Sequence, residues 1–251
     1  MTTYYVDTIT CPKCGVQLAA CRVGSCNTFG AAVFTDGYVR GPMYEESSSI
    51  LTCPHCGTTF WREDASIDQS MPYFEFDKKD RHLSTATKAH RLDFPELVEQ
   101  RIWRTPEQEK YVRIRAWWVW NDDDRKHARP GRPSPEAEAD LKRLVERLGH
   151  PNADLLVDLQ SWWNKRKASR ENVPLGNTLP EVAVANLERL LDLLGQTGED
   201  AVIKAEILRE LGRFEDCLAE LGRTFDDGYA RALSVIRKLA HEGNRRVSRI
   251  V

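Results

Sequence analysis

Cys11-Pro-Lys-Cys14-Gly15 and Cys53-Pro-His-Cys56-Gly57 are two copies of one short pattern, Cys-Pro-x-Cys-Gly, and they decide the fold of the N-terminal part of the chain. A two-residue gap lets both sulfurs of one tight turn reach the same ion, and tetrahedral zinc prefers four thiolates. The glycine can adopt the positive φ that such a turn often needs. The two copies therefore predict a structural zinc site whose ligands are Cys11, Cys14, Cys53 and Cys56.

A pair of disulfides or four buried thiols is the alternative interpretation of these cysteines. Disulfides belong mainly to oxidising compartments, and the opening Met1-Thr-Thr-Tyr-Tyr-Val-Asp lacks the basic start and apolar stretch of a secretory signal. We therefore expect a cytoplasmic protein with a metal site. Cys21 and Cys26 lack the proline and glycine of the pattern, so we expect small, half-buried residues there, with a metal or redox role left open.

The segment between the two motifs, residues 15–52, is longer than the roughly 15–20 residues of a compact ribbon. It must therefore leave and return as ordered structure. Asp36-Gly37 lies between β-favouring runs and indicates a hairpin with a two-residue turn. Thr58-Thr-Phe-Trp-Arg predicts a strand whose aromatic residues cover a small core, and His55 is expected to be exposed. The predicted first domain, residues 1–65, is a zinc ribbon split by this hairpin insertion.

Residues 66–94 are polar and show no clean period of two or 3.6, so they are expected to form a connector. Tyr73-Phe-Glu-Phe76 is the only strand anticipated there, packed on the ribbon. His82 and His90 lie in this stretch without further ligands that the sequence can place, and we expect both on the surface.

Helix signals begin near Pro95. Thr105, Pro106 and Gln108 provide a cap, a first-turn proline and a capping-box partner, and Asn121-Asp-Asp-Asp is expected to end that helix. Further helices are predicted after Ser134-Pro135, after Asn152, over 180–194 and over 227–241. The predicted fold class is α+β: a small N-terminal β zinc ribbon, then an all-α domain of helical hairpins over residues 95–251.

Two tryptophan pairs, Trp117-Trp118 and Trp162-Trp163, have the same spacing. Each begins three positions after an apolar residue, Ile114 or Leu159. The favoured interpretation makes them core residues of amphipathic helices. The alternative makes them a platform on which nucleic-acid bases stack, helped by the basic stretches Arg125-Lys-His-Ala-Arg129 and Lys165-Arg-Lys-Ala-Ser-Arg170.

The segment from Lys204 to Leu221 resembles the central turn of a tetratricopeptide repeat. Its small, apolar, turn and aromatic positions are occupied by Ala205, Leu208, Leu211, Gly212 and Phe214, and Cys217 stands where that family normally has alanine. The resemblance covers one repeat. It implies two packed helices, with Cys217 as a small residue at their contact.

The order of parts also resembles a group of uncharacterised bacterial proteins with a split N-terminal zinc ribbon and a C-terminal helical repeat. The likeness rests on Asn27-Thr-Phe-Gly-Ala31, Cys53-Pro-His-Cys-Gly57, Arg115-Ala-Trp-Trp118 with Asn121-Asp122, and Lys204-Ala-Glu-Ile-Leu-Arg-Glu-Leu-Gly212. It covers most of the chain and implies an architecture and a bacterial cytoplasmic setting. It implies no activity.

Composition narrows the function classes. The 251 residues carry 36 Lys+Arg against 38 Asp+Glu, a net charge of -2, which argues against a globally basic nucleic-acid binder but leaves local patches open. No apolar run approaches the roughly 18 residues of a membrane span. The chain has no phosphate-binding glycine loop and no hydrolase or zinc-protease motif, and four thiolates would close the zinc shell to substrate.

We therefore expect a non-enzymatic interaction module or adaptor, whose helical domain binds a protein partner and whose zinc is structural. The alternative is a nucleic-acid-associated adaptor that uses the ribbon or the helices rich in tryptophan and arginine. No membrane partner is expected.

Overall fold

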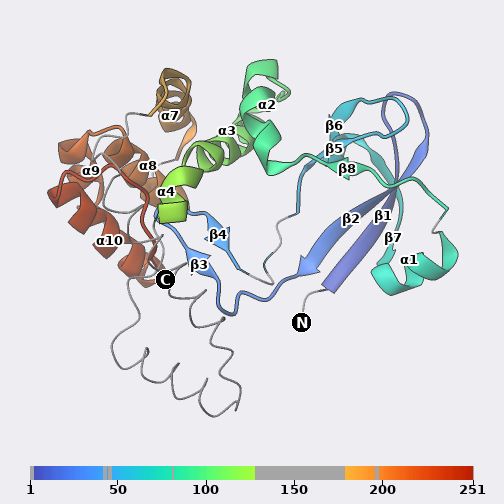
Figure 1. Ribbon diagram of the computed structural model, residues 1–251, viewed down its shortest axis with the longest axis horizontal. Helices are drawn as coiled ribbons and strands as arrows, with labels where there is room; N and C mark the ends of the chain where they lie inside the picture. The colour runs from blue at the N-terminus through green and yellow to red at the C-terminus, as the bar shows by residue number, and fades with distance from the viewer. Residues whose placement is uncertain are drawn as a thin grey trace, which may run out of the picture.

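The computed structural model describes residues 3–41, 44, 47–80, 82–127, 179–195 and 198–250. Two three-stranded antiparallel sheets lie at one end of the molecule, and a two-stranded sheet and a group of helices lie toward the other (Figure 1). The predicted combination of an N-terminal β region and helices is therefore present. The helices expected after Ser134 and Asn152 lie outside the described residues, as do Trp162, Trp163 and the basic stretch 165–170.

Two three-stranded sheets form the β unit. Strands β1 (Thr3–Thr10), β2 (Gln17–Ser25) and β7 (Ser66–Pro72) pair in the order β2-β1-β7. Strands β5 (Ile50–Thr52), β6 (Thr59–Trp61) and β8 (Thr87–Lys88) pair in the order β6-β5-β8. Every pairing in both sheets is antiparallel. Each Cys-Pro-x-Cys-Gly motif thus forms the turn of a hairpin, one between β1 and β2 and the other between β5 and β6.

The segment expected as a connector contributes to these sheets through β7 and β8, and a short 3-10 helix, η2 (Arg91–Asp93), follows β8. The strand expected at Tyr73–Phe76 is wrong, because these residues open helix α1 (Tyr73–Lys79). Phe76 is buried in a cluster with Val6 and Met71, which a helical turn after Pro72 places against β1 and β7. His82 and His90 are exposed, as predicted.

The hairpin insertion consists of β3 (Ala32–Val33) and β4 (Val39–Arg40). Its turn has three residues rather than the predicted two. The N–H of Phe34 donates to the carbonyl of Tyr38 at 2.9 Å, and Gly37 closes the turn with φ of +79°. This is a three-residue hairpin loop that ends on a glycine in the left-handed region. It directs Asp36 into the protein, where its side chain is buried.

The hairpin insertion lies beside the helices (Figure 1), and the side chain of Asn121 donates a hydrogen bond to Asp36 in its turn. The C-terminal segment pairs with it: the N–H of Thr35 donates to Ser248 at 2.9 Å, and the N–H of Ile250 donates to Val33 at 2.7 Å. The chain between the two cysteine motifs therefore crosses from the β unit to the helical unit and back.

The helical unit begins with α2 (Phe94–Gln100), α3 (Pro106–Trp120) and α4 (Asp122–His127). Thr105 caps α3 as predicted, since its hydroxyl accepts the N–H of Gln108. In a capping box, the side chain of Gln108 would accept the backbone N–H of Thr105. Here it accepts the N–H of the preceding residue, Arg104, at 2.7 Å. Asn121 ends α3 as predicted, although α4 follows at once.

The unit continues with α7 (Glu181–Leu193), α8 (Gly198–Glu210), α9 (Phe214–Glu220), the 3-10 turn η3 (Asp227–Tyr229) and α10 (Ala230–His241). The helices expected over 180–194 and 227–241 are thus confirmed. Gly212 joins α8 to α9 with φ of +81°, and Ala205 and Cys217 are fully buried in the core between these helices and α10. This forms one helical hairpin, and a repeat architecture beyond it stays a prediction.

The β unit and the helical unit share a packed interface. Trp61 from β6 lies in a cluster with Phe94 and Leu97 from α2 and with Val112 from α3. The indole N–H of Trp61 donates to the carbonyl of Ile102 at 2.8 Å. Burial of such side chains contributes on the order of 1.5–3 kcal/mol each, so the two units are held together by core packing as well as by the chain.

Candidate metal centre

The sulfurs of Cys11, Cys14, Cys53 and Cys56 all lie within 4.8 Å of one another. The Sγ atoms of Cys11 and Cys56 are 3.8 Å apart, as are those of Cys14 and Cys53. A metal–sulfur distance of about 2.3 Å in a regular tetrahedron places the sulfurs about 3.8 Å apart. The geometry therefore fits one tetrahedral metal ion, and all seven cysteines are free thiols, so the disulfide alternative is wrong.

The two motifs form matching knuckles, the first over residues 11–16 and the second over residues 53–58. In each, the N–H of the first cysteine donates to the carbonyl five residues later at 2.9 Å. In each, the glycine N–H donates back to the first cysteine, at 3.0 Å in the first knuckle and 2.9 Å in the second. Gly15 and Gly57 have φ of +72° and +71°, which favours glycine over residues with a Cβ.

The thiols differ in their electrostatic surroundings. The hydroxyl and the backbone N–H of Thr58 lower the pKa of Cys56 to about 6. Burial raises the pKa of Cys11, but the backbone N–H groups of Cys14 and Lys13 outweigh it, so this pKa is lowered. The N–H of Val16 acts to lower the pKa of Cys14, but burial and the neighbouring thiols raise it to about 12. Four neighbouring thiols cannot all ionise without a cation, because the negative charges of the thiolates repel one another. A divalent cation would offset this repulsion.

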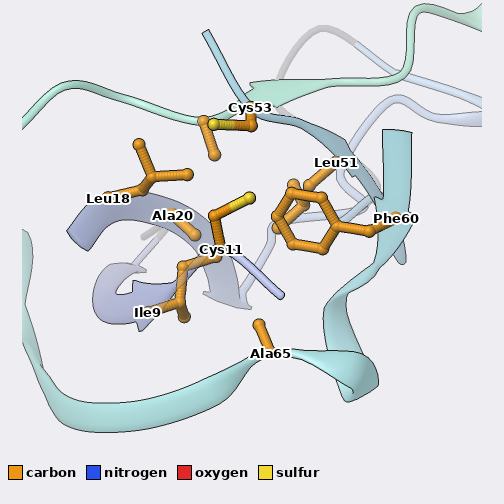
Figure 2. Close-up of a cluster of buried hydrophobic side chains, with 9 residues drawn as sticks. Ile9, Cys11, Leu18, Ala20, Leu51, Cys53, Phe60 and Ala65 are labelled. Atoms are coloured by element: carbon orange, nitrogen blue, oxygen red, sulfur yellow. The ribbon is translucent and has the colours of Figure 1, made fainter. Parts of the chain in front are cut away.

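A hydrophobic cluster surrounds the knuckles. Cys11 and Cys53 are buried among Ile9, Leu18, Leu51 and Phe60, and these residues come from both hairpins of the β unit (Figure 2). Cys14 and Cys56 are half-buried at the edge of the cluster. An ion held here would join the tips of the two hairpins and would be largely shielded from solvent.

The other candidate ligands lie elsewhere. Cys21 and Cys26 are half-buried, as predicted, and neither belongs to the four-sulfur group found among the described residues. His55 is exposed on the second knuckle, also as predicted.

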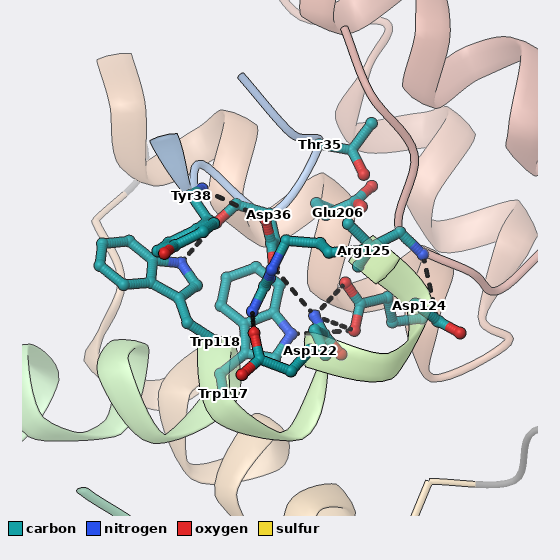
Figure 3. Close-up of polar contacts among 12 residues, drawn as sticks. Thr35, Asp36, Tyr38, Trp117, Trp118, Asp122, Asp124, Arg125 and Glu206 are labelled. Carbon is teal, nitrogen blue, oxygen red and sulfur yellow. Dashed lines mark hydrogen bonds and ion pairs between the residues drawn. The ribbon is translucent and has the colours of Figure 1, made fainter. Parts of the chain in front are cut away.

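A buried polar cluster lies between the hairpin insertion and the helices (Figure 3). Arg125 is fully buried and forms an ion pair with Asp36 and a second with Asp122, the latter at 3.1 Å. Asn121 donates its side-chain N–H to Asp36 at 3.2 Å and to Glu210 at 3.1 Å. No sequence motif pointed to this cluster, because its members come from three separate segments of the chain.

The cluster holds an excess of acids. Three buried carboxylates, on Asp36, Glu206 and Glu210, face only two buried guanidinium groups among the described residues of the cluster, those of Arg125 and Arg209. Burial raises the pKa of Asp36 against the opposing effect of Arg125. Burial and the charge of Glu206 raise the pKa of Glu210 well above its ordinary value. The folded protein therefore favours a proton on this cluster.

The contacts of Trp117 and Trp118 bear on the prediction that the tryptophans are core residues and do not stack on bases. Trp117 is a core residue whose indole N–H donates to Glu210 at 2.8 Å, so it presents no exposed face for base stacking. Arg125, expected in the alternative to contact nucleic acid, is enclosed by the protein. Trp118 is half-buried and donates its indole N–H to the carbonyl of Asp36 at 2.9 Å.

No protein-family model matches this chain, and neither the curated proteins nor the solved structures searched gave a similar protein. None of the helices in the described ranges is both long and apolar enough to cross a bilayer.

Proposed function

We propose that this chain is a non-enzymatic interaction module or adaptor whose β unit is stabilised by one structural zinc ion. The spacing of the four knuckle sulfurs is the observation that carries this proposal. Four protein ligands complete a tetrahedral shell, so no position stays open for a substrate or an activated water. The ion would contribute to folding and not to a reaction.

The donor set supports zinc over harder cations. Thiolates are soft ligands that favour zinc, copper(I) or iron–sulfur chemistry and disfavour magnesium and calcium. Iron in a four-thiolate site would give visible absorbance, whereas zinc is colourless. The small apolar cluster around the knuckles also suits a metal-stabilised domain, because metal binding can supply folding free energy that so little buried surface cannot.

Metal analysis of the purified full-length protein tests the assignment. We expect one zinc per chain, no visible absorbance, and loss of the zinc in Cys11→Ser and Cys53→Ser. Cys21→Ser is the matched control, since it removes a half-buried thiol of the same unit that lies outside the four-sulfur group. Full zinc content in Cys11→Ser, or iron in place of zinc, would contradict the proposal.

A groove between α7, α8 and α9 supports a protein partner for the helical unit. It has a volume of about 500 Å³ and combines acidic, basic and apolar side chains. Lys204 pairs with Glu220 at 3.5 Å, and Arg213 pairs with Asp216 at 2.8 Å, so both signs of charge are displayed along it. Such a surface offers complementary contacts to a polar peptide segment. The nucleic-acid alternative loses support from this unit, because Trp117 and Arg125 are buried.

A further inference from the structure

A second cavity, the junction pocket, lies where the hairpin insertion, the β unit and helices α2 and α3 meet. Its volume is about 300 Å³, at the lower end of the roughly 300–1,000 Å³ of small-molecule sites. Its walls come from segments far apart in the sequence. Its basic and aromatic lining residues include Tyr38, Arg40, Lys88, Tyr111, Arg115 and Trp118.

The described part of the junction-pocket lining is basic. Arg40, Lys88, Arg91 and Arg115 line the pocket, and none of the described lining residues is an acid. Asp122, which pairs with Arg91, lies outside the lining. Arg40 is exposed, and its guanidinium carbon lies 5.6 Å from the centre of the Phe34 ring and 5.9 Å from that of the Tyr38 ring. A pocket lined in this way attracts an anionic group.

Aromatic rings form the other part of the lining. The ring of Trp118 is held in place by its indole N–H bond to Asp36, and Tyr38 meets it edge-on with centroids 5.5 Å apart. The guanidinium of Arg115 lies 3.4 Å from the centre of the Tyr111 ring and 5.4 Å from that of Trp118. Planar rings and guanidinium groups both stack on the faces of nucleobases.

We propose that the junction pocket binds a nucleotide. Arg40, Lys88 and Arg115 contact its phosphate, and Tyr38 and Trp118 contact its base. Only a ligand that combines an anionic group with a planar ring would contact both the basic side chains and the aromatic rings of the lining. This inference goes beyond the proposed function and does not rest on it, because neither the knuckles nor the groove of the helical unit lines the pocket.

Calorimetric titration of the full-length protein with four probes tests the proposal: AMP, adenosine, inorganic phosphate and a ten-nucleotide single-stranded oligoadenylate. We expect at least one of the two nucleotide probes, AMP or the oligonucleotide, to bind at least tenfold more tightly than adenosine or phosphate. Binding of AMP assigns the site to free nucleotides, whereas binding of the oligonucleotide alone assigns it to an unpaired nucleotide of a strand. Either result supports nucleotide recognition.

Substitutions locate the binding. Arg40→Gln and Arg115→Gln are each expected to weaken binding about tenfold or more, as for the loss of one charge-assisted hydrogen bond. Arg231→Gln is the control, because Arg231 is an exposed arginine on α10 outside the pocket. Arg40→Gln is expected to keep the parental melting temperature, so it decides the test if Arg115→Gln does not fold. Neither AMP nor the oligonucleotide binding better than adenosine and phosphate, or undiminished binding in Arg40→Gln, would overturn the proposal.

Discussion

Replacing Arg125 with methionine tests whether the buried polar cluster fixes the hairpin insertion to the helices. The side chains of Arg125 and Asp36 are both 0% exposed. The substitution removes both ion pairs of Arg125 and its contact with the Tyr38 ring, whose centre lies 4.4 Å from the guanidinium carbon. Asp36 would keep only the Asn121 side chain and the Tyr38 N–H as donors, both at 3.2 Å. A buried carboxylate would then lack its balancing charge.

The expected cost is about 3–5 kcal/mol, the range for removing one partner of a buried ion pair. For a chain of this size, that corresponds to a fall in melting temperature of roughly 6–20 °C. Thermal unfolding followed by circular dichroism measures it. The loss should be smaller at pH 5 than at pH 8, because burial raises the pKa of Asp36 and protonation removes the unbalanced charge.

Two further variants make the test specific. Arg213→Met removes a surface arginine that is 46% exposed and paired with Asp216, so it should cost less than about 1 kcal/mol. Asp36→Asn combined with Arg125→Met should recover part of the loss, since the amide carries no charge. If Arg125→Met melts within about 1 kcal/mol of the parent, the cluster does not hold the hairpin insertion as argued.

The remaining predictions concern Glu210 and the groove of the helical unit. Because the folded pKa of Glu210 lies well above its ordinary value of 4.5, its favourable contribution to stability is fully present below that value and is lost as pH rises through the folded pKa. Glu210→Gln should therefore gain melting temperature relative to the parent between pH 5 and pH 8, and a constant difference over that range would contradict the assignment. For the groove, tagged protein treated with nuclease should capture a partner that is lost in Lys204→Glu with Arg213→Glu. Lys238→Glu, on the exposed face of α10 and outside the groove, is the control and should keep the partner. If the double variant keeps the partner and Lys238→Glu loses it, the contact lies elsewhere.

The cysteine group could be predicted from the sequence because its determinants are local. Each knuckle is set by a cysteine pair, a proline and a glycine within five residues, and the hydrogen bonds that form it also stay within the motif. The starts of α3 and α7 were predictable for the same reason, since Thr105 and Pro180 act on the turn that follows them. Whether the two knuckles lie next to each other depends on the rest of the fold. A shared ion needs all four cysteines at one place, and for that reason the sequence predicts that the knuckles come together.

The placement of the hairpin insertion could not be predicted in this way. Asp36-Gly37 indicates a turn, but its partners Asn121 and Arg125 lie more than 80 positions away, and no local pattern connects them. Asp36 resembles an ordinary turn residue until the helices are packed around it. The predicted two-residue turn is wrong for a related reason, because an Asp-Gly pair can occur in hairpin turns of two or of three residues. The helix at Tyr73–Lys79 likewise depends on Phe76 packing against β1.

The position of the junction pocket links the knuckles to the helices. The loop that the metal would close, residues 15–52, carries Tyr38 and Arg40 at its middle, and these side chains line the pocket beside Arg115 and Trp118. Closing a loop at its base lowers the entropy of its free ensemble, while the Asp36–Arg125 pair fixes its far end. A structural ion at one end and a buried ion pair at the other therefore act on the same segment. Loss of either should loosen the hairpin wall of the pocket before the helices unfold, because the core formed by α8, α9 and α10 contains no residue of that loop.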